Sequence, residues 1–134
     1  MKALTLWQPW ASLIAEGYKD KETRSWKTNY RGKLAIHSAK TTKALYPFYP
    51  DYAPCGSVIA ESAFPLGAIL CTCNLLYCLP VEDVEPDEFG DYSAGRWAWV
   101  LGNVQKIEPI YVKGKQGLWN LDEATELAVM EALK

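Results

Sequence analysis

Charged and aromatic side chains gather in one short stretch of the sequence, residues 17–26. Lys19 and Glu22 stand three positions apart. Arg24 and Trp26 follow Glu22 with the period of two that puts strand residues on one face. A carboxylate near an ammonium group can move a proton to or from an attacking water or a ribose 2′-hydroxyl. Lys19 and Glu22 are therefore candidate catalytic residues.

Ligand binding and structural pairing are open alternatives for the same stretch. Glu22 could accept a hydrogen bond from an exocyclic amine such as N4 of cytosine, while Lys19 or Arg24 binds a phosphate. Equally, Glu22 could form a salt bridge with Arg24 or Arg31 that only ties the strand to the following turn. The residue types fit all three roles.

Tryptophans and polar residues elsewhere could complete a ligand site. Trp stacks on unpaired bases, a contact worth about 1–3 kcal/mol per base, and it is also a large core filler. The glycines of residues 113–117 could let backbone N–H groups approach an anion, or could simply form a tight turn. The candidate ligand-binding residues are Gln8, Trp10, Ser12, Arg24, Trp26, Arg31, Lys113, Lys115, Gln116 and Trp119.

The four cysteines and the single histidine match no standard zinc spacing, so we expect no metal and no other cofactor. Cys71 and Cys73 lie in an alternating apolar row within residues 66–79, which predicts small core residues on the buried face of a strand. Unpaired cysteines fit a reducing compartment. His37 has no Cys or Ser partner at a recognisable spacing, which favours a surface or hydrogen-bonded role over a catalytic one.

Short strands and two helices must position these residues. A strand over 3–6 is followed by a helix of about two turns, which begins at Pro9 and ends at Gly17 because proline suits a first turn and glycine a stop. Asn120 and Glu123 have the spacing of a capping box for a final helix. Alternating apolar residues predict further strands over 21–26, 33–38, 66–79, 96–101 and 107–112.

Three features are left without an assigned role. Thr41–Pro65 contains four prolines and is predicted as a long irregular or short-helical excursion. Val81–Asp91 is acidic and irregular. Leu127 and Met130 fall off the apolar side of the final helix, so this helix either packs broadly or forms a homodimer contact.

The composition describes an ordinary globular chain. It has 134 residues, 49% hydrophobic and 22% charged, and we predict a single domain over residues 1–134. The net charge of −2 hides an asymmetry, because residues 1–43 carry nine Lys or Arg and three Asp or Glu. A basic N-terminal third favours a phosphate-facing surface, unless the acidic segment balances it in space.

No apolar run approaches the roughly 20 residues that span a bilayer, and no signal peptide precedes the first strand, so we expect a cytoplasmic protein without membrane contact.

Five motifs occur in order along the chain. They are Leu6-Trp7-Gln8-Pro9-Trp10-Ala11-Ser12-Leu13-Ile14, Gly17-x-Lys19-x-x-Glu22-x-Arg24-Ser25-Trp26, Tyr30-Arg31-Gly32-x-Leu34-x-Ile36-His37, Gly95-Arg96-Trp97-Ala98-Trp99-Val100-Leu101 and Lys113-Gly114-Lys115-Gln116-Gly117-Leu118-Trp119. Together they resemble the ASCH domain family (activating signal cointegrator homology). The resemblance implies an α+β fold, a small mixed β-barrel of the PUA-like type (pseudouridine synthase and archaeosine transglycosylase) with a short N-terminal helix and a C-terminal helix.

The same resemblance implies a ligand cleft between the first helix and the barrel. The family is associated with binding of RNA or single-stranded DNA and with modified-base recognition, and some members are described as ribonucleases or as amidohydrolases of acylated cytidines. The amidohydrolase pattern has a Lys, a Thr three residues later and a distant Glu. Here Lys19 fits, but Glu22 replaces the Thr, and Thr23 would face the other side of the strand.

These observations predict a module that binds RNA, single-stranded DNA or a modified nucleoside. We expect the first helix, the strand after it and the glycine turn at 113–117 to meet around a basic cleft. The alternative is a small hydrolase, either a ribonuclease or an N-acylcytidine amidohydrolase. The partners implied are RNA or another single-stranded nucleic acid, or a nucleoside-like small molecule, with a homodimer as a further option.

Overall fold

A computed structural model describes residues 1–45 and 64–134 of the chain. In chain order its elements are β1 (Lys2–Leu6), α1 (Trp10–Ala15), β2 (Lys21–Arg24), β3 (Gly32–Ser38), β4 (Ala68–Pro80), the 3-10 turn η2 (Val81–Asp83), β5 (Trp97–Tyr111), β6 (Leu118–Asn120) and α3 (Glu123–Ala132). Within these residues the strands form one sheet in the order β2-β5-β4-β3-β1-β6. β1 and β3 run parallel, and the other neighbours run antiparallel.

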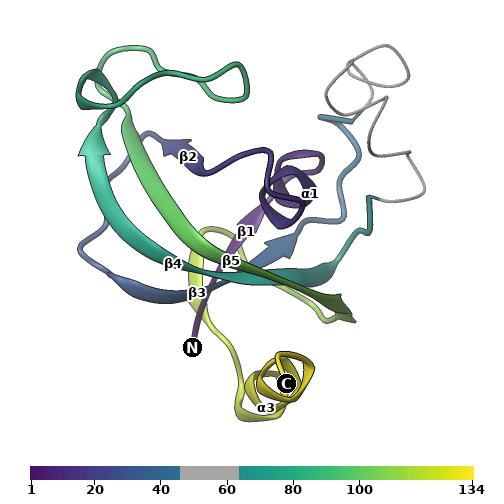
Figure 1. Cartoon of the computed structure of the whole chain (residues 1–134). Helices are drawn as coiled ribbons and strands as arrows, with labels where there is room; N and C mark the ends of the chain where they lie inside the picture. Colours follow the sequence, from purple (N-terminus) through teal and green to yellow (C-terminus); the bar gives the residue numbers. More distant parts are fainter. Residues whose placement is uncertain (46–63) are drawn as a thin grey trace.

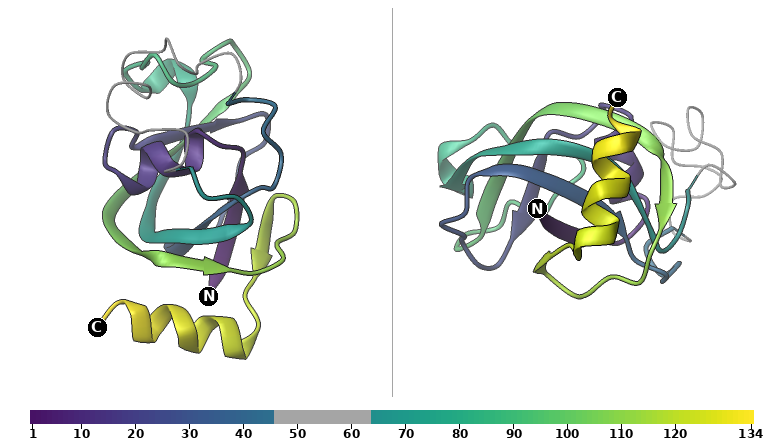
Figure 2. Two further views of the ribbon diagram at one scale, coloured as in Figure 1. Left: turned by 90° about the vertical axis from the view of Figure 1, so that its right-hand side faces the viewer. Right: turned by 90° about the horizontal axis from the view of Figure 1, so that it is seen from below.

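The sheet curls into a half-barrel, with the long strands β4 and β5 following its curve (Figure 1). α1 lies at the open side of the curve, and α3 lies outside it, across the outer face of the sheet (Figures 1 and 2). The predicted α+β class and the mixed barrel with one helix near each end of the chain are confirmed. No helix of the described residues is long and apolar enough to cross a bilayer.

Alternating residues of the strands supply two apolar clusters, one on each face of the sheet. Leu4 and Ile36 point into the curve, where they pack with Ile14 of α1. Their neighbours in the chain point to the other face, where α3 contributes the fully buried Val129. α1 is held at the mouth of the barrel because its residues 11–15 are buried.

The cysteine prediction is confirmed for the strand residues. Cys71 and Cys73 are completely buried in the cluster inside the curve, and both thiols are free. Burial raises the pKa of the Cys73 thiol to about 12, although Lys33 acts in the opposite direction. Cys55 lies outside the described residues.

The alternation predicted along residues 66–79 breaks in its second half. Leu75 is buried, but Tyr77 is exposed and Cys78 is buried instead. The register against β5 shifts between Leu75 and Tyr77, and such a bulge moves every later side chain to the opposite face.

Two other expectations differ from the structure, and a third falls mostly outside the described residues. Residues 96–101 and 107–112 were predicted as two strands, but β5 runs unbroken through the positive φ of Asn103. The short strand β6 contains Asn120, which therefore does not cap the last helix. Asp122 does so instead, and its carboxylate accepts a hydrogen bond of 2.7 Å from the backbone N–H of Thr125. Of Thr41–Pro65, residues 46–63 lie outside the described residues.

Candidate functional site

A pocket of about 820 Å³ opens where the curled sheet fails to close, between β2 and the β1 side of the barrel. Its lining comes from residues 5–7, residue 10, residues 22–26, residues 89–91 and residues 116–117, together with Ala39 and Arg96. The first helix, the strand after it and the glycine turn thus all contribute to one hollow.

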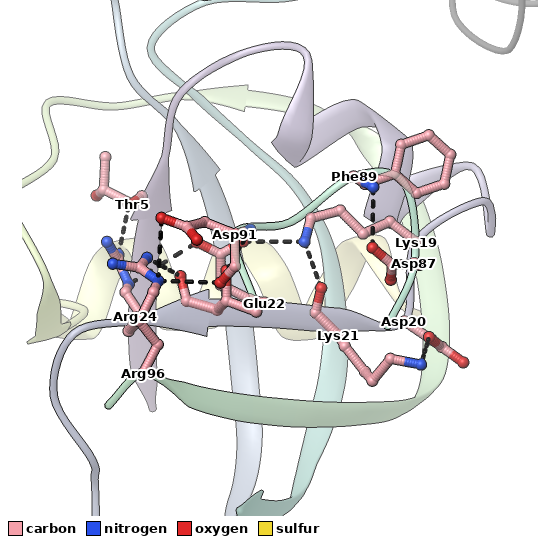
Figure 3. A network of polar contacts seen from close by, with 11 residues as sticks. Thr5, Lys19, Asp20, Lys21, Glu22, Arg24, Asp87, Phe89, Asp91 and Arg96 are labelled. Carbon is pink, nitrogen blue, oxygen red and sulfur yellow. Dashed lines mark hydrogen bonds and ion pairs between the residues drawn. The ribbon is translucent and has the colours of Figure 1, made fainter. Parts of the chain in front are cut away.

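The ion pair of Lys19 with Glu22 forms the polar centre of one wall. Nζ of Lys19 lies 3.1 Å from Oε1 of Glu22 and also donates to the backbone carbonyl of Lys21 (Figure 3). The Lys19 side chain is 1% exposed and does not line the pocket, whereas Glu22 is 13% exposed and does. Lys19 therefore acts on the pocket through the carboxylate of Glu22.

Arg24 bridges the gap in the barrel. Its Nη2 donates a 3.1 Å hydrogen bond to the carbonyl of Thr5, and its Nε lies 3.9 Å from Oε2 of Glu22 (Figure 3). That Nε is buried and makes no hydrogen bond within the described residues. Burial lowers the pKa of the guanidinium, against the opposing effect of Glu22, and the nearby Arg96 lowers it further.

Arg96 fastens the loop before β5 to β2. Its Nη2 donates to the carbonyl of Thr23 over 3.1 Å and its Nε to the carbonyl of Asp91 over 3.0 Å, with the Asp91 carboxylate 3.7 Å away. The Thr23 hydroxyl in turn accepts the backbone N–H of Asp91 over 3.1 Å. These contacts bring Phe89, Gly90 and Asp91 to the pocket, so part of the acidic segment is a wall of the site.

Aromatic rings stand around the opening. Trp7 is 48% exposed and Trp26 is 40% exposed, and both line the pocket together with Trp10 and Phe89. The Trp26 ring is fixed edge-on against Trp99, with centroids 4.9 Å apart. Two partly exposed indoles, of which that of Trp26 is fixed, therefore line a pocket that also contains charged groups.

Five of the residues predicted from the sequence line the pocket: Trp10, Glu22, Arg24, Trp26 and Gln116. Gln8 and Ser12 lie in the protein interior instead. The Gln8 amide donates to the Ser12 hydroxyl over 2.7 Å and to the carbonyl of Pro65 over 2.8 Å, and it accepts the Ser12 backbone N–H over 2.9 Å. These two side chains anchor the start of α1.

Arg31, Lys113, Lys115 and Trp119 lie outside the lining. Arg31 is exposed and donates to the carbonyls of Thr28 and Tyr30 within its own turn. The charged residues of the described lining are Glu22, Arg24, Asp91 and Arg96, so their formal charges cancel. The basic cleft expected from the N-terminal charge is therefore a cavity of mixed charge with lysines outside it.

His37 and Trp119 support the pocket from behind. The two ring nitrogens of His37 lie 3.2 Å from Oγ1 of Thr5 and 2.9 Å from the carbonyl of Val112, which fits a neutral ring that donates through Nε2. Nε1 of Trp119 donates to the same Thr5 hydroxyl over 2.9 Å. A side chain at Gly114 would collide with the His37 ring, so the glycine turn packs against it closely.

Several lining residues were not among those predicted. Thr23 lines the pocket although it was expected to face away, because β2 is an edge strand and the pocket lies along that edge. Phe89, Asp91 and Arg96 were missed since no periodic pattern places the loop before β5. Trp7 directly follows the first strand in the sequence, which was a usable signal, and the structure shows that it is 48% exposed.

The chain is similar to proteins of one family. The model of the ASCH domain matches residues 4–111. Activating signal cointegrator 1 of Mus musculus and of Homo sapiens is 31% identical over 130 residues, which is 89% of this chain and 22% of either relative. The chain thus spans about a fifth of the length of these curated relatives.

Solved structures agree at the level of the fold. The crystal structure of ASCH from Zymomonas mobilis has a TM-score of 0.64 at 14% identity, over 99% of this chain and 95% of that one. A mutant form of the same bacterial protein gives 0.63 over 99% and 98% of the two chains, also at 14% identity. With its motifs matched over most of its length and its curled sheet shared with a solved ASCH protein, the chain belongs to the ASCH domain family.

Proposed function

We propose that this chain binds an unpaired base of RNA or single-stranded DNA, or the base of a modified nucleoside, in the pocket between β2 and the β1 side of the barrel. The observation that carries the proposal is the pair of exposed indoles, Trp7 and Trp26, on the rim of a pocket that contains Glu22. Membership of a family associated with RNA binding supports the same conclusion.

Stacking would supply most of the binding free energy. A base has an apolar face, and an aromatic side chain that covers it contributes about 1–3 kcal/mol whatever the sequence. Trp26 is suited to this role because its contact with Trp99 fixes the ring while 40% of its surface stays exposed. Little conformational entropy is then lost when the base arrives.

Polar groups beside the rings would orient the base. The carboxylate of Glu22 is an acceptor on the pocket wall. A base edge that carries an N–H can donate a hydrogen bond to it. The carboxylate would repel a phosphate, so the phosphates of the ligand would lie outside the pocket, where the exposed Lys113 and Lys115 could bind them.

Affinity for RNA tests this proposal directly. A labelled single-stranded hexaribonucleotide of mixed sequence is titrated with protein at several salt concentrations, and binding is followed by fluorescence anisotropy. Trp26→Ala should weaken binding by roughly fivefold to a hundredfold through the lost stacking contact. Tyr111→Ala is the matched control, since Tyr111 is an aromatic residue that is 68% exposed and lies outside the pocket. Equal affinity of both variants and the wild type would remove the pocket from the account.

A hydrolase is the second candidate, and the Lys19–Glu22 pair favours it. A carboxylate on the pocket wall, fixed by an ammonium group 3.1 Å away, has the properties of a general base for water or for a 2′-hydroxyl. Wild type and Glu22→Gln are compared on a panel of N-acylated nucleosides and on a labelled RNA. Turnover that disappears in the variant supports the enzyme, and no turnover of any substrate by the wild type rejects it.

A further inference from the structure

We propose that the ligand is a polynucleotide strand rather than a free nucleoside, and that Lys27 with Trp97 forms a second base-stacking position beside the pocket. This inference rests on the binding function proposed above. To that proposal it adds a binding position outside the pocket, and it limits the ligand to a polynucleotide strand.

The loop from β2 to β3, residues 25–31, leads from the pocket to this second position. Ser25 and Trp26 still line the pocket, and the next residue, Lys27, is exposed. Nζ of Lys27 lies 5.4 Å from the centroid of the Trp97 ring. Trp97 is partly exposed and does not line the pocket, so a ligand confined to the pocket would not use it.

A cation and an aromatic ring meet twice along this rim. The guanidinium of Arg24 lies 5.7 Å from the centroid of Trp26, and Lys27 repeats the arrangement over Trp97. Arg24 and Trp97 are also direct partners in the β2–β5 register, so the two pairs are neighbours in space. A single strand presents the complementary repeat, one base and one phosphate per nucleotide.

The second position is held in place by the fold. The Trp97 ring packs against the cluster inside the barrel. The loop is braced by a hydrogen bond of 3.5 Å from the backbone N–H of Thr28 to Sγ of Cys78, and by Arg31, which donates to the Thr28 carbonyl over 2.9 Å. The Lys27 side chain remains free to move, so a base can take its place over the ring while the ammonium group turns to a phosphate.

Binding of ligands of different length distinguishes this site from the pocket. The mixed-sequence hexaribonucleotide is compared with an equimolar mixture of the four ribonucleoside 5′-monophosphates, the first by anisotropy and the second by isothermal titration calorimetry. Lys27→Ala should weaken hexamer binding about fivefold and reduce the slope of log K against log salt by about 0.7, the value for one phosphate contact on a single strand. Affinity for the monophosphates should stay unchanged. Lys134→Ala removes another exposed lysine, on the far side of the molecule, and serves as the control.

Two variants of the ring complete the test, with thermal unfolding used to check that each is folded. Trp97→Phe should retain hexamer binding within about twofold, and Trp97→Leu should lose about as much as Lys27→Ala or more. Full hexamer affinity in Lys27→Ala and Trp97→Leu, or a hexamer that binds no tighter than the monophosphates, overturns the second position while the pocket still stands. A wild type that binds neither ligand overturns the pocket as well.

Discussion

Two charged side chains with unequal exposure set the chemistry of the pocket. Both Lys19 and Glu22 were named from the sequence, and their spacing correctly suggested a pair. The sequence could not reveal that only Glu22 reaches the pocket, since this depends on how the turn before β2 buries the lysine. For Lys19 itself to act in catalysis, its ammonium group would have to break its contacts with the Glu22 carboxylate and the Lys21 carbonyl.

The buried ion pair makes Lys19 a stability determinant. Lys19→Met leaves the Glu22 carboxylate with only the more distant guanidinium of Arg24, 3.9 Å away, and loss of one member of a buried pair costs at most about 3–5 kcal/mol. We expect the free energy of unfolding, measured with urea, to fall by an amount of this order. The double variant Lys19→Met/Glu22→Gln should lose less than Lys19→Met alone because no unpaired charge remains. A single variant as stable as the wild type would contradict the pairing.

His37 should make stability depend on pH in a narrow window. Burial lowers the pKa of the ring, and the hydrogen bond to Val112 opposes this only in part. The unfolded chain therefore binds a proton at higher pH than the folded one does, so stability is complete above about pH 6.5 and falls as the pH drops towards the folded pKa.

The measurement is the urea midpoint between pH 7.5 and 5. It should fall over this range in the wild type and stay nearly flat in His37→Gln, which carries no titrating ring. Because the chain has a single histidine, the difference between the two profiles reports on His37. Parallel profiles would show that the buried ring does not control this slope.

At the scale of elements, the strands were easier to predict than the loop that completes the site. The sequence pattern correctly placed β1, β2, β3 and β4. In β4 it correctly predicted the buried Cys71, Cys73 and Leu75, but register shifts put Ile69 on the other face and leave Tyr77 exposed. It divided β5 in two, since the register shifts opposite Thr72–Asn74 and Ile69–Cys71 interrupt the pattern without ending the strand. The sequence of the loop before β5 has no periodic pattern of apolar residues. Its position is set by contacts of Thr23 and Arg96.

Thr23 should control how firmly that loop closes one wall. Thr23→Val keeps the shape of the side chain but removes the acceptor for the Asp91 backbone N–H. We expect this amide to exchange with solvent about fivefold faster, the effect of losing one ordinary hydrogen bond. Thr72→Val is the matched control, because the Thr72 hydroxyl is buried without a partner in the described structure. Unchanged exchange in Thr23→Val would mean that Arg96 alone holds the loop.

At the scale of the whole molecule, the function proposed here follows from a barrel that does not close. β2 and β6 are the ends of the sheet, and the pocket lies on the side where β2 faces the end of β1. Arg24 crosses the gap to the Thr5 carbonyl, so the opening is held by a side chain rather than by strand pairing. The sequence named Arg24 but not this geometry, because the gap depends on the order of all the strands.

The charge asymmetry of the sequence also needed the fold for its interpretation. Many cations of the first third lie outside the pocket, while Asp91 from the acidic segment lies within its wall. A pocket whose lining has balanced charge suits a neutral base better than it suits a free anion.

Whether the pocket takes an unpaired base can be read from the indole N–H signals of the six tryptophans by NMR, assigned with Trp→Phe variants. On titration with the single-stranded hexaribonucleotide, the signals of Trp7 and Trp26 should shift most, and that of Trp119, which is bonded to Thr5 behind the wall, should change little. Shifts centred on Trp119, with Trp7 and Trp26 unmoved at saturation, would contradict the account.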